Sequence, residues 1–192
     1  EDAKGLITAC IVDAEIDVKA TRFPKPDVVG DIGSLAINKQ VPVGEIIEDR
    51  YPWFEPLTEQ ITNVLDRYAK RKLANGLMDF DDLLVLWLRL MKEHEDVRTM
   101  YQQRFQFVLV DEYQDTNLLQ AELIDLLGAR YKNVMVVGDD SQSIYSWRGA
   151  NYANIMEFPK RYPGAAVYKI ETNYRSTPEI LDLANAAIAA NT

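Results

Sequence analysis

Two adjacent carboxylates, Asp111 and Glu112, follow directly after the short apolar run Phe107–Val110. An apolar run of this length predicts a strand buried on both faces, in the middle of a sheet covered by helices. The carboxyl ends of such strands form the edge at which open α/β sheets bind ligands. Because carboxylates are costly to bury without partners, the pair predicts a metal ion or an activated water at that edge.

Considered alone, this pair has two interpretations. In nucleoside triphosphatases, one acid at a strand end holds Mg²⁺, usually through water, and a second acid polarises the attacking water. That pattern assigns Asp111 to the metal and Glu112 to the water. An apolar run followed by Asp-Glu also fits a plain pair of acids at a strand end, so the motif by itself leaves both interpretations open.

A second apolar run, Asn133–Gly138, also ends in polar residues, and Gln142 is one of them. A glutamine at that edge is able to hydrogen-bond a terminal phosphate or the attacking water, and so to sense the state of a nucleotide.

Two aromatic residues and an arginine come next, Tyr145, Trp147 and Arg148, in a segment with no helical periodicity. Exposed aromatic rings beside an arginine suit stacking on unpaired bases. The alternative is that Tyr145 and Trp147 belong to the core, where large aromatic residues are common.

The third apolar run, Ala166–Ile170, leads to Tyr174 and Arg175. An arginine at this edge is able to reach a γ-phosphate, and a tyrosine is able to stack on a nucleobase. The alternatives are an arginine in a loop salt bridge and a packed tyrosine. Suitable chemistry after each of three consecutive strands favours one shared nucleotide site.

Helices are predicted between these runs. Asn117 and Gln120 are spaced as a capping box for a helix to Leu127, a short helix is expected within 151–161, and Ser176-Thr177-Pro178-Glu179 opens the last one. Strand and helix therefore alternate from residue 107 onward, which predicts an α/β fold with a parallel sheet.

The first hundred residues are predicted to be mainly helical. Helices are expected over 1–22, from Asp27 as the cap to Asn38, over 56–75, over 80–91 with Asp79 as the cap, and over 95–104. Residues 40–56 hold three prolines and predict a loop with one short helical turn. The run LLVLWLRLM in 80–91 is apolar nearly all round, so that helix is expected to be well buried.

Composition excludes several classes of protein. The 192 residues carry a net charge of −9, so no overall basic surface indicates nucleic acid, although a groove is able to be locally basic. The single cysteine, Cys10, excludes a disulfide framework, and the single histidine, His94, argues against a histidine metal site or a Ser-His-Asp triad. With no signal peptide and no long apolar run, we expect a cytoplasmic protein, in a bacterial cytoplasm or nucleoid, with no membrane partner.

Four segments, DEYQDTN, VGDDSQSIYSWRGA, ETNYRST and MDFDDLL, resemble those of the UvrD/Rep/PcrA family of superfamily 1 DNA helicases. The order and spacing match over about residues 57–192. The resemblance implies part of a RecA-like P-loop nucleoside triphosphatase sheet with an inserted helical subdomain. It also implies ATP and Mg²⁺ as cofactors, and single-stranded or duplex-junction DNA as the partner.

The resemblance implies a role for each nucleotide-site residue. Asp111 serves Mg²⁺ and Glu112 is the catalytic base. Gln142 and Arg175 contact the γ-phosphate, with Gln142 coupling hydrolysis to DNA, and Tyr174 stacks on adenine.

On the DNA side, the resemblance places Trp147 on a base of the single strand, with Tyr145 and Arg148 in the same contact segment. The chain departs from the family at Ser141, where aspartate is usual, so no role is carried over to it, and at Thr172, where glutamine is commoner. The acids of MDFDDLL are expected to cap a helix and support the structure.

The phosphate-binding loop G-x-x-x-x-G-K-[ST] is absent, and the sequence contains no Gly-Lys pair. We therefore expect a piece of a first motor domain that begins after this loop and ends before the second motor domain. Residues 1–76 are expected to be part of the helical insertion, and residues 77–192 the C-terminal part of the motor domain.

The leading hypothesis is an ATP-dependent DNA helicase, translocating 3′-to-5′ in repair or replication, of which residues 1–192 alone are inactive and bind ATP poorly. One alternative is a truncated interaction module without catalysis, and another is the motor of an AddA-like or RecB-like helicase-nuclease. Because part of the sheet is missing, we also expect self-association through exposed sheet edges.

Overall fold

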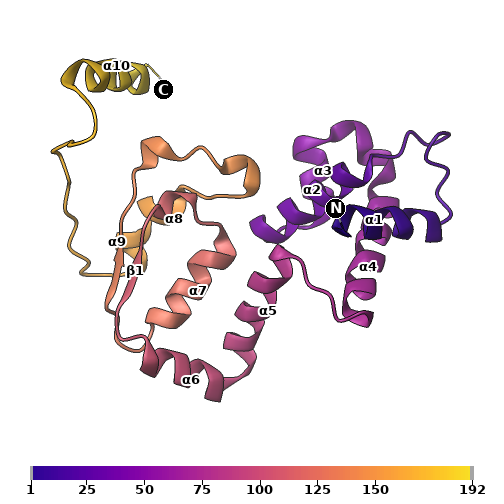
Figure 1. The fold of residues 1–192 in the computed structure, drawn as a ribbon, viewed down its shortest axis with the longest axis horizontal. Helices are drawn as coiled ribbons and strands as arrows, with labels where there is room; N and C mark the ends of the chain where they lie inside the picture. The colour runs from indigo at the N-terminus through magenta and orange to yellow at the C-terminus, as the bar shows by residue number, and fades with distance from the viewer. Residues whose placement is uncertain (1, 191–192) are drawn as a thin grey trace.

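The structure, a computed structural model, describes residues 2–190 and every side chain among them except that of Arg148. Its first part is a bundle of α1 (Asp2–Asp13), α2 (Pro26–Lys39), α3 (Val43–Arg50), the 3₁₀ helix η1 (Pro52–Leu57) and α4 (Thr58–Ala74). Figure 1 shows these helices gathered on the right of the molecule. They share one apolar core, whose fully buried members include Val29, Ile32, Ile47, Ile61 and Val64.

The second part is mixed. Its elements are α5 (Phe80–Glu93), α6 (Glu95–Arg104), β1 (Val108–Val110), η2 (Tyr113–Asp115), α7 (Leu118–Gly128), β2 (Val134–Val136), η3 (Asp140–Gln142), η4 (Ser146–Arg148), α8 (Ala153–Met156), α9 (Phe158–Arg161) and α10 (Pro178–Ala189). β1 and β2 pair in parallel, and α7 makes the crossover between them. A mostly helical chain with a small parallel sheet is consistent with the predicted α/β class.

Two predicted helix starts are confirmed as capping boxes. Oδ1 of Asp79 accepts a hydrogen bond from the backbone N of Asp82 at 2.9 Å, and Oδ2 of Asp82 accepts one from the backbone N of Asp79 at 2.9 Å. Asn117 and Gln120 make the same reciprocal pair at the start of α7, at 2.8 and 3.0 Å. Each box gives partners to backbone N–H groups that have none within the helix.

Two predictions for the first sixty residues are wrong. The helix predicted over 1–22 ends at Asp13, and turns follow it, with a left-handed backbone at Glu15. Residues 40–56 form α3 and η1 rather than a loop. Pro42 is the N-cap of α3 and Pro52 lies in the first turn of η1, where a missing N–H costs no hydrogen bond. These prolines therefore begin helices instead of breaking them.

The start of α2 also differs from the prediction. Lys25, not Asp27, is the residue before the helix, and Pro26 takes its first position. Asp27 lies in the first turn, where its charge still favours the helix N-terminus.

The prediction that α5 is well buried is wrong. Only Leu88 and Met91 of this helix are buried. The helix packs on α7, α6 and α2 along one side, so the stripe formed by Phe80, Leu83, Trp87 and Leu90 remains exposed. Apolar composition predicted burial here, but burial depends on which elements are present to cover each face.

The prediction that β1 is buried on both faces is also wrong. Leu109 is 69% exposed, and its partner across the sheet, Met135, is 54% exposed. The other face contacts α7. The sheet is thus covered by a helix on one face only among the described residues.

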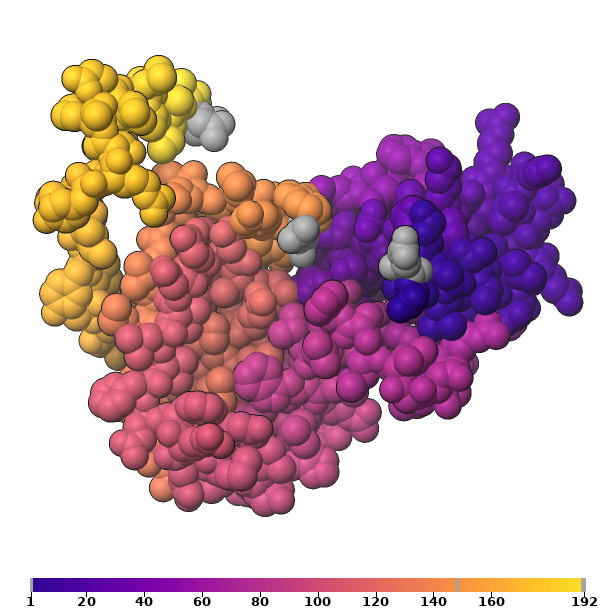
Figure 2. Space-filling model, in the orientation of Figure 1, coloured from indigo at the N-terminus to yellow at the C-terminus, as the bar shows by residue number. Residues whose placement is uncertain are grey.

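The third strand, predicted over 166–170, is not formed, and its apolar residues Val167, Tyr168 and Ile170 are exposed. A strand exists only by pairing with a neighbour, and the described sheet holds β1 and β2 alone. The chain instead runs to α10, which buries no residue and stands off the body in Figures 1 and 2. None of the helices in the described part of the chain, α10 included, is long and apolar enough to cross a membrane.

Candidate functional site

The carboxyl ends of β1 and β2 lie side by side. Backbone pairing continues beyond the strands: Val137 N donates to Val110 O at 2.8 Å, and Tyr113 N donates to Val137 O at 2.9 Å. Parallel pairing therefore places the Asp111-Glu112 turn next to the segment that follows β2. The structure thus brings the first two predicted groups of site residues to one edge.

Glu112 has a left-handed backbone, with φ of 50° and ψ of 41°, although it is not a glycine. Such a conformation costs about 1 kcal/mol or more and is typical of functional sites. The Oδ1 atom of Asp111 accepts a hydrogen bond from the backbone N of Glu112 at 2.9 Å, which supports the turn. Both carboxylates remain exposed at the sheet edge.

Gln114 links the two strand ends, a role that no pattern in the sequence predicted. Its fully buried side chain donates from Nε2 to Oε2 of Glu112 at 2.7 Å and accepts at Oε1 from the backbone N of Asp139 at 3.1 Å. The only sequence signal is its place within DEYQDTN. Because one rigid amide contacts both segments, Glu112 is held in register with the end of β2.

Gln142 joins the same network through Asp139. Nε2 of Gln142 donates to Oδ2 of Asp139 at 2.8 Å, and Oδ1 of Asp139 caps η3 by accepting from Ser141 N at 3.0 Å. A continuous hydrogen-bonded chain therefore runs from Glu112 through Gln114 and Asp139 to Gln142. We call these four residues the strand-end network.

Tyr113, the residue that follows Glu112, packs in the core beside this network. Its side chain is fully buried, its ring meets Phe158 edge to face at 5.8 Å between centroids, and its hydroxyl accepts from Arg161 at 3.2 Å. Burial raises the pKa of the Tyr113 hydroxyl even though the Arg161 guanidinium opposes the shift. Arg161 is itself paired with Asp125. Tyr113 is therefore held by the Phe158 ring and by an arginine that has an acidic partner.

The donor set at this edge fits Mg²⁺. The hard carboxylate oxygens of Asp111 suit this ion, which keeps several waters and relies on one or two carboxylates plus substrate phosphates. Among the described residues there is no group of three or more His, Cys, Asp or Glu side chains able to form a protein cage for a metal. A site with a single carboxylate ligand, completed by a nucleotide, is the type that these residues permit.

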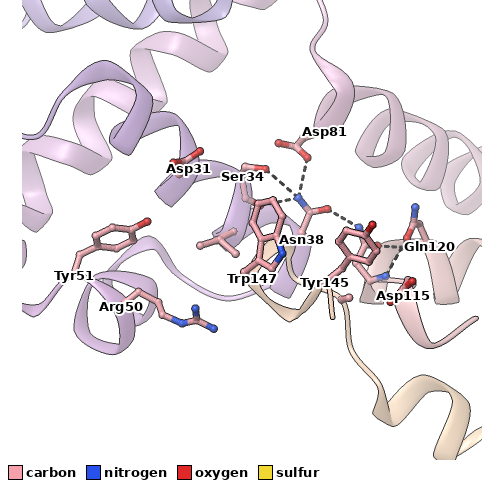
Figure 3. A pocket seen from close by; sticks show the side chains of 13 residues that line it. Asp31, Ser34, Asn38, Arg50, Tyr51, Asp81, Asp115, Gln120, Tyr145 and Trp147 are labelled. Atoms are coloured by element: carbon pink, nitrogen blue, oxygen red, sulfur yellow. Dashed lines mark hydrogen bonds between the residues drawn. The ribbon is translucent and has the colours of Figure 1, made fainter. Parts of the chain in front are cut away.

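Tyr145 and Trp147 lie together on the rim of a cavity of about 740 Å³. Figure 3 shows their rings facing the same space as Asn38 and Arg50, and the two ring centroids are 6.5 Å apart. The two side chains are 40% and 55% exposed, which contradicts the alternative that they belong to the core.

The third member of that predicted group is Arg148. Its backbone ends η4, but its side chain lies outside the described residues.

Tyr174 and Arg175 are not brought to the strand-end network. They lie between α9 and α10, in the segment that Figure 1 shows leaving the body, and Tyr174 is 94% exposed. The local turn is held by Asn173, whose Oδ1 accepts from Arg175 N at 2.8 Å. Without a third strand, nothing among the described residues carries these side chains to the sheet edge.

The acids of MDFDDLL do more than cap α5. Nζ of Lys72, which is buried, lies 2.5 Å from Oδ2 of Asp79 and 2.6 Å from Oδ2 of Asp82. Tyr68 also donates to Oδ2 of Asp79, at 2.9 Å. The acids thus have the predicted structural role, and Lys72 is their partner. The sequence did not predict this pairing, because a lysine on the preceding helix carries no recognisable signal.

Comparisons with known proteins identify one family. A model of the UvrD/REP helicase N-terminal domain matches residues 37–163. An ATP-dependent DNA helicase PcrA of Bacillus subtilis (strain 168) is 38% identical over 190 residues, an alignment that covers 99% of this chain and 25% of that protein. PcrA proteins of Leuconostoc citreum and Staphylococcus aureus (strain NCTC 8325 / PS 47) are 48% and 37% identical, over 92% and 99% of this chain and 25% of each relative. The chain thus spans about a quarter of the length of these relatives.

Proposed function

Because this chain belongs to the UvrD/REP helicase N-terminal domain family, we propose that it is part of the first motor domain of an ATP-dependent DNA helicase. The pair β1–β2 is then part of a larger RecA-like P-loop sheet. Residues 1–76 are then part of the helical insertion subdomain, and residues 77–192 are the C-terminal part of the motor domain. The parallel crossover through α7 and the separate core of α1 to α4 support this division.

The observation that carries the proposal is the strand-end network. Glu112 uses Oε2 to accept from Gln114, which leaves Oε1 to take a proton from an attacking water. Gln142 lies at the other end of the network, on an exposed turn from which its amide is able to contact a terminal phosphate. When Gln142 moves on nucleotide binding, the hydrogen bonds of the strand-end network transmit this movement to Glu112, the proposed base.

ATP and Mg²⁺ are the proposed substrate and cofactor. Asp111 would hold the ion, since its Oδ1 atom accepts from Glu112 N and its other carboxylate oxygen has no such bond. Bound Mg²⁺ offsets the negative charge of the phosphates during transfer. Arg175 is proposed to contact the γ-phosphate, and Tyr174 the adenine. Both contacts require that the complete sheet of the parent protein places the segment of these two residues at the sheet edge.

DNA is proposed to stack on Trp147, with Tyr145 and Arg148 beside it. The partial exposure of Tyr145 and Trp147 to solvent supports this, because stacking on single-stranded bases needs aromatic rings that a base is able to reach. We further propose 3′-to-5′ translocation in DNA repair or replication in the cytoplasm. Unwinding of duplexes that carry a 3′ tail, and not of duplexes with a 5′ tail, checks the polarity.

Replacing the base tests the nucleotide site. In the full-length parent protein, Glu112→Gln keeps the side-chain shape and removes the proton acceptor, so the DNA-stimulated rate of ATP hydrolysis should fall at least about 100-fold. ATP binding, measured by equilibrium titration, should persist. The same change on the exposed surface of α3, Glu48→Gln, is the matched control and should leave the rate unaltered. Hydrolysis by the Glu112 variant at the wild-type rate would exclude this residue as the base.

Residues 1–192 alone should neither hydrolyse ATP nor bind it tightly, because the sequence contains no phosphate-binding Gly-Lys loop. A colorimetric phosphate assay with and without single-stranded DNA measures this. Rates near those of the full-length protein would contradict it. A full-length protein that hydrolyses no ATP would instead favour the alternative of a non-catalytic interaction module.

A further inference from the structure

Asn38 is a buried polar residue in the last turn of α2, with only 6% of its surface exposed. Its Nδ2 donates to Oδ1 of Asp81 at 2.8 Å and to two atoms of Ser34, at 2.9 and 3.2 Å. Its Oδ1 accepts from Nδ2 of Asn117 at 2.6 Å. Figure 3 shows these bonds radiating from the one amide group. A single side chain thus joins the helical bundle to the starts of α5 and α7.

The bond to Asn117 leads onward toward the catalytic turn. Asn154, also buried, donates to the backbone O of Thr116 at 2.9 Å and to the backbone O of Asn117 at 3.3 Å. Oγ1 of Thr116 donates to the backbone O of Tyr113 at 2.6 Å. Tyr113 is the neighbour of Glu112 in the chain. A run of hydrogen bonds therefore connects α2 to the turn that carries the proposed base.

Asn38 also contacts the proposed DNA segment directly. Gly149, two residues after Trp147, is buried with φ of +89°, and a Cβ atom there would lie 2.9 Å from Cβ of Asn38. The absence of a side chain at this position lets the loop approach α2 closely. Figure 2 shows the orange loop abutting the purple helical region. The backbone of the loop that carries Tyr145 and Trp147 is thereby packed against α2.

We propose that Asn38 is a positioning residue that holds both the Tyr145–Gly149 loop and the Glu112 turn in register with the helical bundle. When the Asn38 amide is lost, DNA contact at the Tyr145–Gly149 loop no longer affects ATP hydrolysis at the Glu112 turn. The activity part of this inference rests on the proposed function, whereas the structural part stands on the contacts alone.

The chemistry of the site favours asparagine at this position. Oδ1 must accept from Asn117 while Nδ2 donates to the Asp81 carboxylate, and only an amide supplies both groups in this short side chain. In Asn38→Asp the acceptor is retained, but a second carboxylate meets that of Asp81. Two carboxylates at hydrogen-bond distance repel each other, so this variant breaks the tie to Asp81 and keeps the one to Asn117. The bonds to Ser34 that it also loses lie within α2 and join no other element.

Amide hydrogen exchange on residues 1–192 tests the structural part. The reporters are the backbone N–H groups of Ala150 and Asn151, which donate to Tyr145 O and Thr116 O. In Asn38→Asp these amides should exchange about tenfold faster, equivalent to about 1.4 kcal/mol. The double variant N38D/D81N restores one donor and one acceptor with their direction reversed, and should return exchange close to the wild-type rate.

Ser34→Ala is the matched control, because it removes one acceptor of Asn38 and leaves the bonds to Asp81 and Asn117 in place. Its exchange rates should match those of the wild type. Unchanged exchange in Asn38→Asp, or no recovery in the double variant, overturns the proposal. The test remains valid even when Asn38→Asp destabilises the whole chain. In that case the return of slow exchange in N38D/D81N reports on the hydrogen bond between residues 38 and 81, formed with its direction reversed.

The full-length protein tests the coupling. The ratio of DNA-stimulated to basal ATPase rate should fall about tenfold in Asn38→Asp and recover in N38D/D81N, while the KM for ATP changes less than about twofold. A ratio that stays at the wild-type value while exchange is accelerated refutes the coupling role. If the wild-type protein has no ATPase activity, the proposed function fails instead, and the exchange experiment still decides the structural part.

Discussion

Lys72 is the buried cation on which the junction between α4 and α5 depends. A buried ammonium is stable only with partners, and Asp79, Asp82 and the face of the Tyr68 ring, 4.4 Å away, surround it. Burial alone would raise the pKa of Asp79, but hydrogen bonds from Lys72, Asp82 N and the Tyr68 hydroxyl outweigh it and lower that pKa below its ordinary value. Burial, and then the Asp79 carboxylate, raise the pKa of the Tyr68 hydroxyl.

This cluster predicts a loss of stability in acid. Because the pKa of Asp79 is lowered in the folded chain, its contribution is present above the unfolded value of about 3.9 and is lost as the pH falls through the folded value. At pH 7, Asp79→Asn should lower the free energy of unfolding by about 1–3 kcal/mol, since Lys72 keeps Asp82. The difference from wild type should shrink below about pH 4.

Urea unfolding at pH 7 and at pH 3 measures both parts of this prediction. The control is Asp49→Asn, because Asp49 forms exposed ion pairs with Lys39 and Arg50 and should matter by less than about 0.5 kcal/mol. An Asp79 variant as stable as wild type at pH 7 would show that the buried cluster contributes nothing.

At the scale of elements, the parallel pair β1–β2 depends on a close approach at Gly138. A Cβ atom there would lie 2.3 Å from Oε1 of Gln114, 2.7 Å from Cδ1 of Ile155 and 3.2 Å from Tyr113 N. Gln114, which belongs to the strand-end network, and Tyr113, which packs beside it, are both fully buried. The strand end therefore has no room for a side chain.

Gly138→Ala should lower the free energy of unfolding by about 1–3 kcal/mol through overpacking. It should also displace the Gln114 amide, visible as a chemical-shift change of its side-chain NH₂ in NMR spectra. Gly5→Ala is the control, because Gly5 lies in α1 and a Cβ atom there would meet nothing within 4 Å. Since alanine favours a helix more than glycine does, this variant should raise the free energy of unfolding by up to about 1 kcal/mol. Equal stability of the Gly138 variant and wild type would refute the close packing.

At the scale of the whole molecule, two apolar surfaces lack a cover among the described residues. One is the bare face of the sheet, at Leu109 and Met135, and the other is the stripe on α5. Exposed apolar area of this kind favours association. The net charge of −9 opposes it through repulsion, which weakens with added salt.

We therefore predict that residues 1–192 self-associate in a concentration-dependent way, more strongly at high salt. Size-exclusion chromatography with light scattering should give a mass above 21.9 kDa at micromolar concentrations. The double variant L109T/M135T keeps β propensity and removes the apolar face, so it should shift the mass toward that of the monomer. A monomer under all these conditions would contradict the prediction.

Local interactions are what the sequence determined on its own. The helix cap at Asp79, the capping box at Asn117 and the parallel β1–α7–β2 unit depend on residues close in the chain, so pattern alone predicted them. The same holds for the family, because its motifs are contiguous segments. The placement of Glu112 and Gln142 at the same edge of the sheet followed from a general property of parallel strands.

Tertiary structure decided everything that depends on partners distant in sequence. Apolar composition predicted burial of α5 and of both faces of β1, but burial requires covering elements, which the described residues supply on one side only. The third strand failed for the same reason, because pairing needs a neighbour. Gln114 and Asn38 were missed because an amide shows its importance only through what it contacts, and those contacts join segments that the sequence keeps far apart.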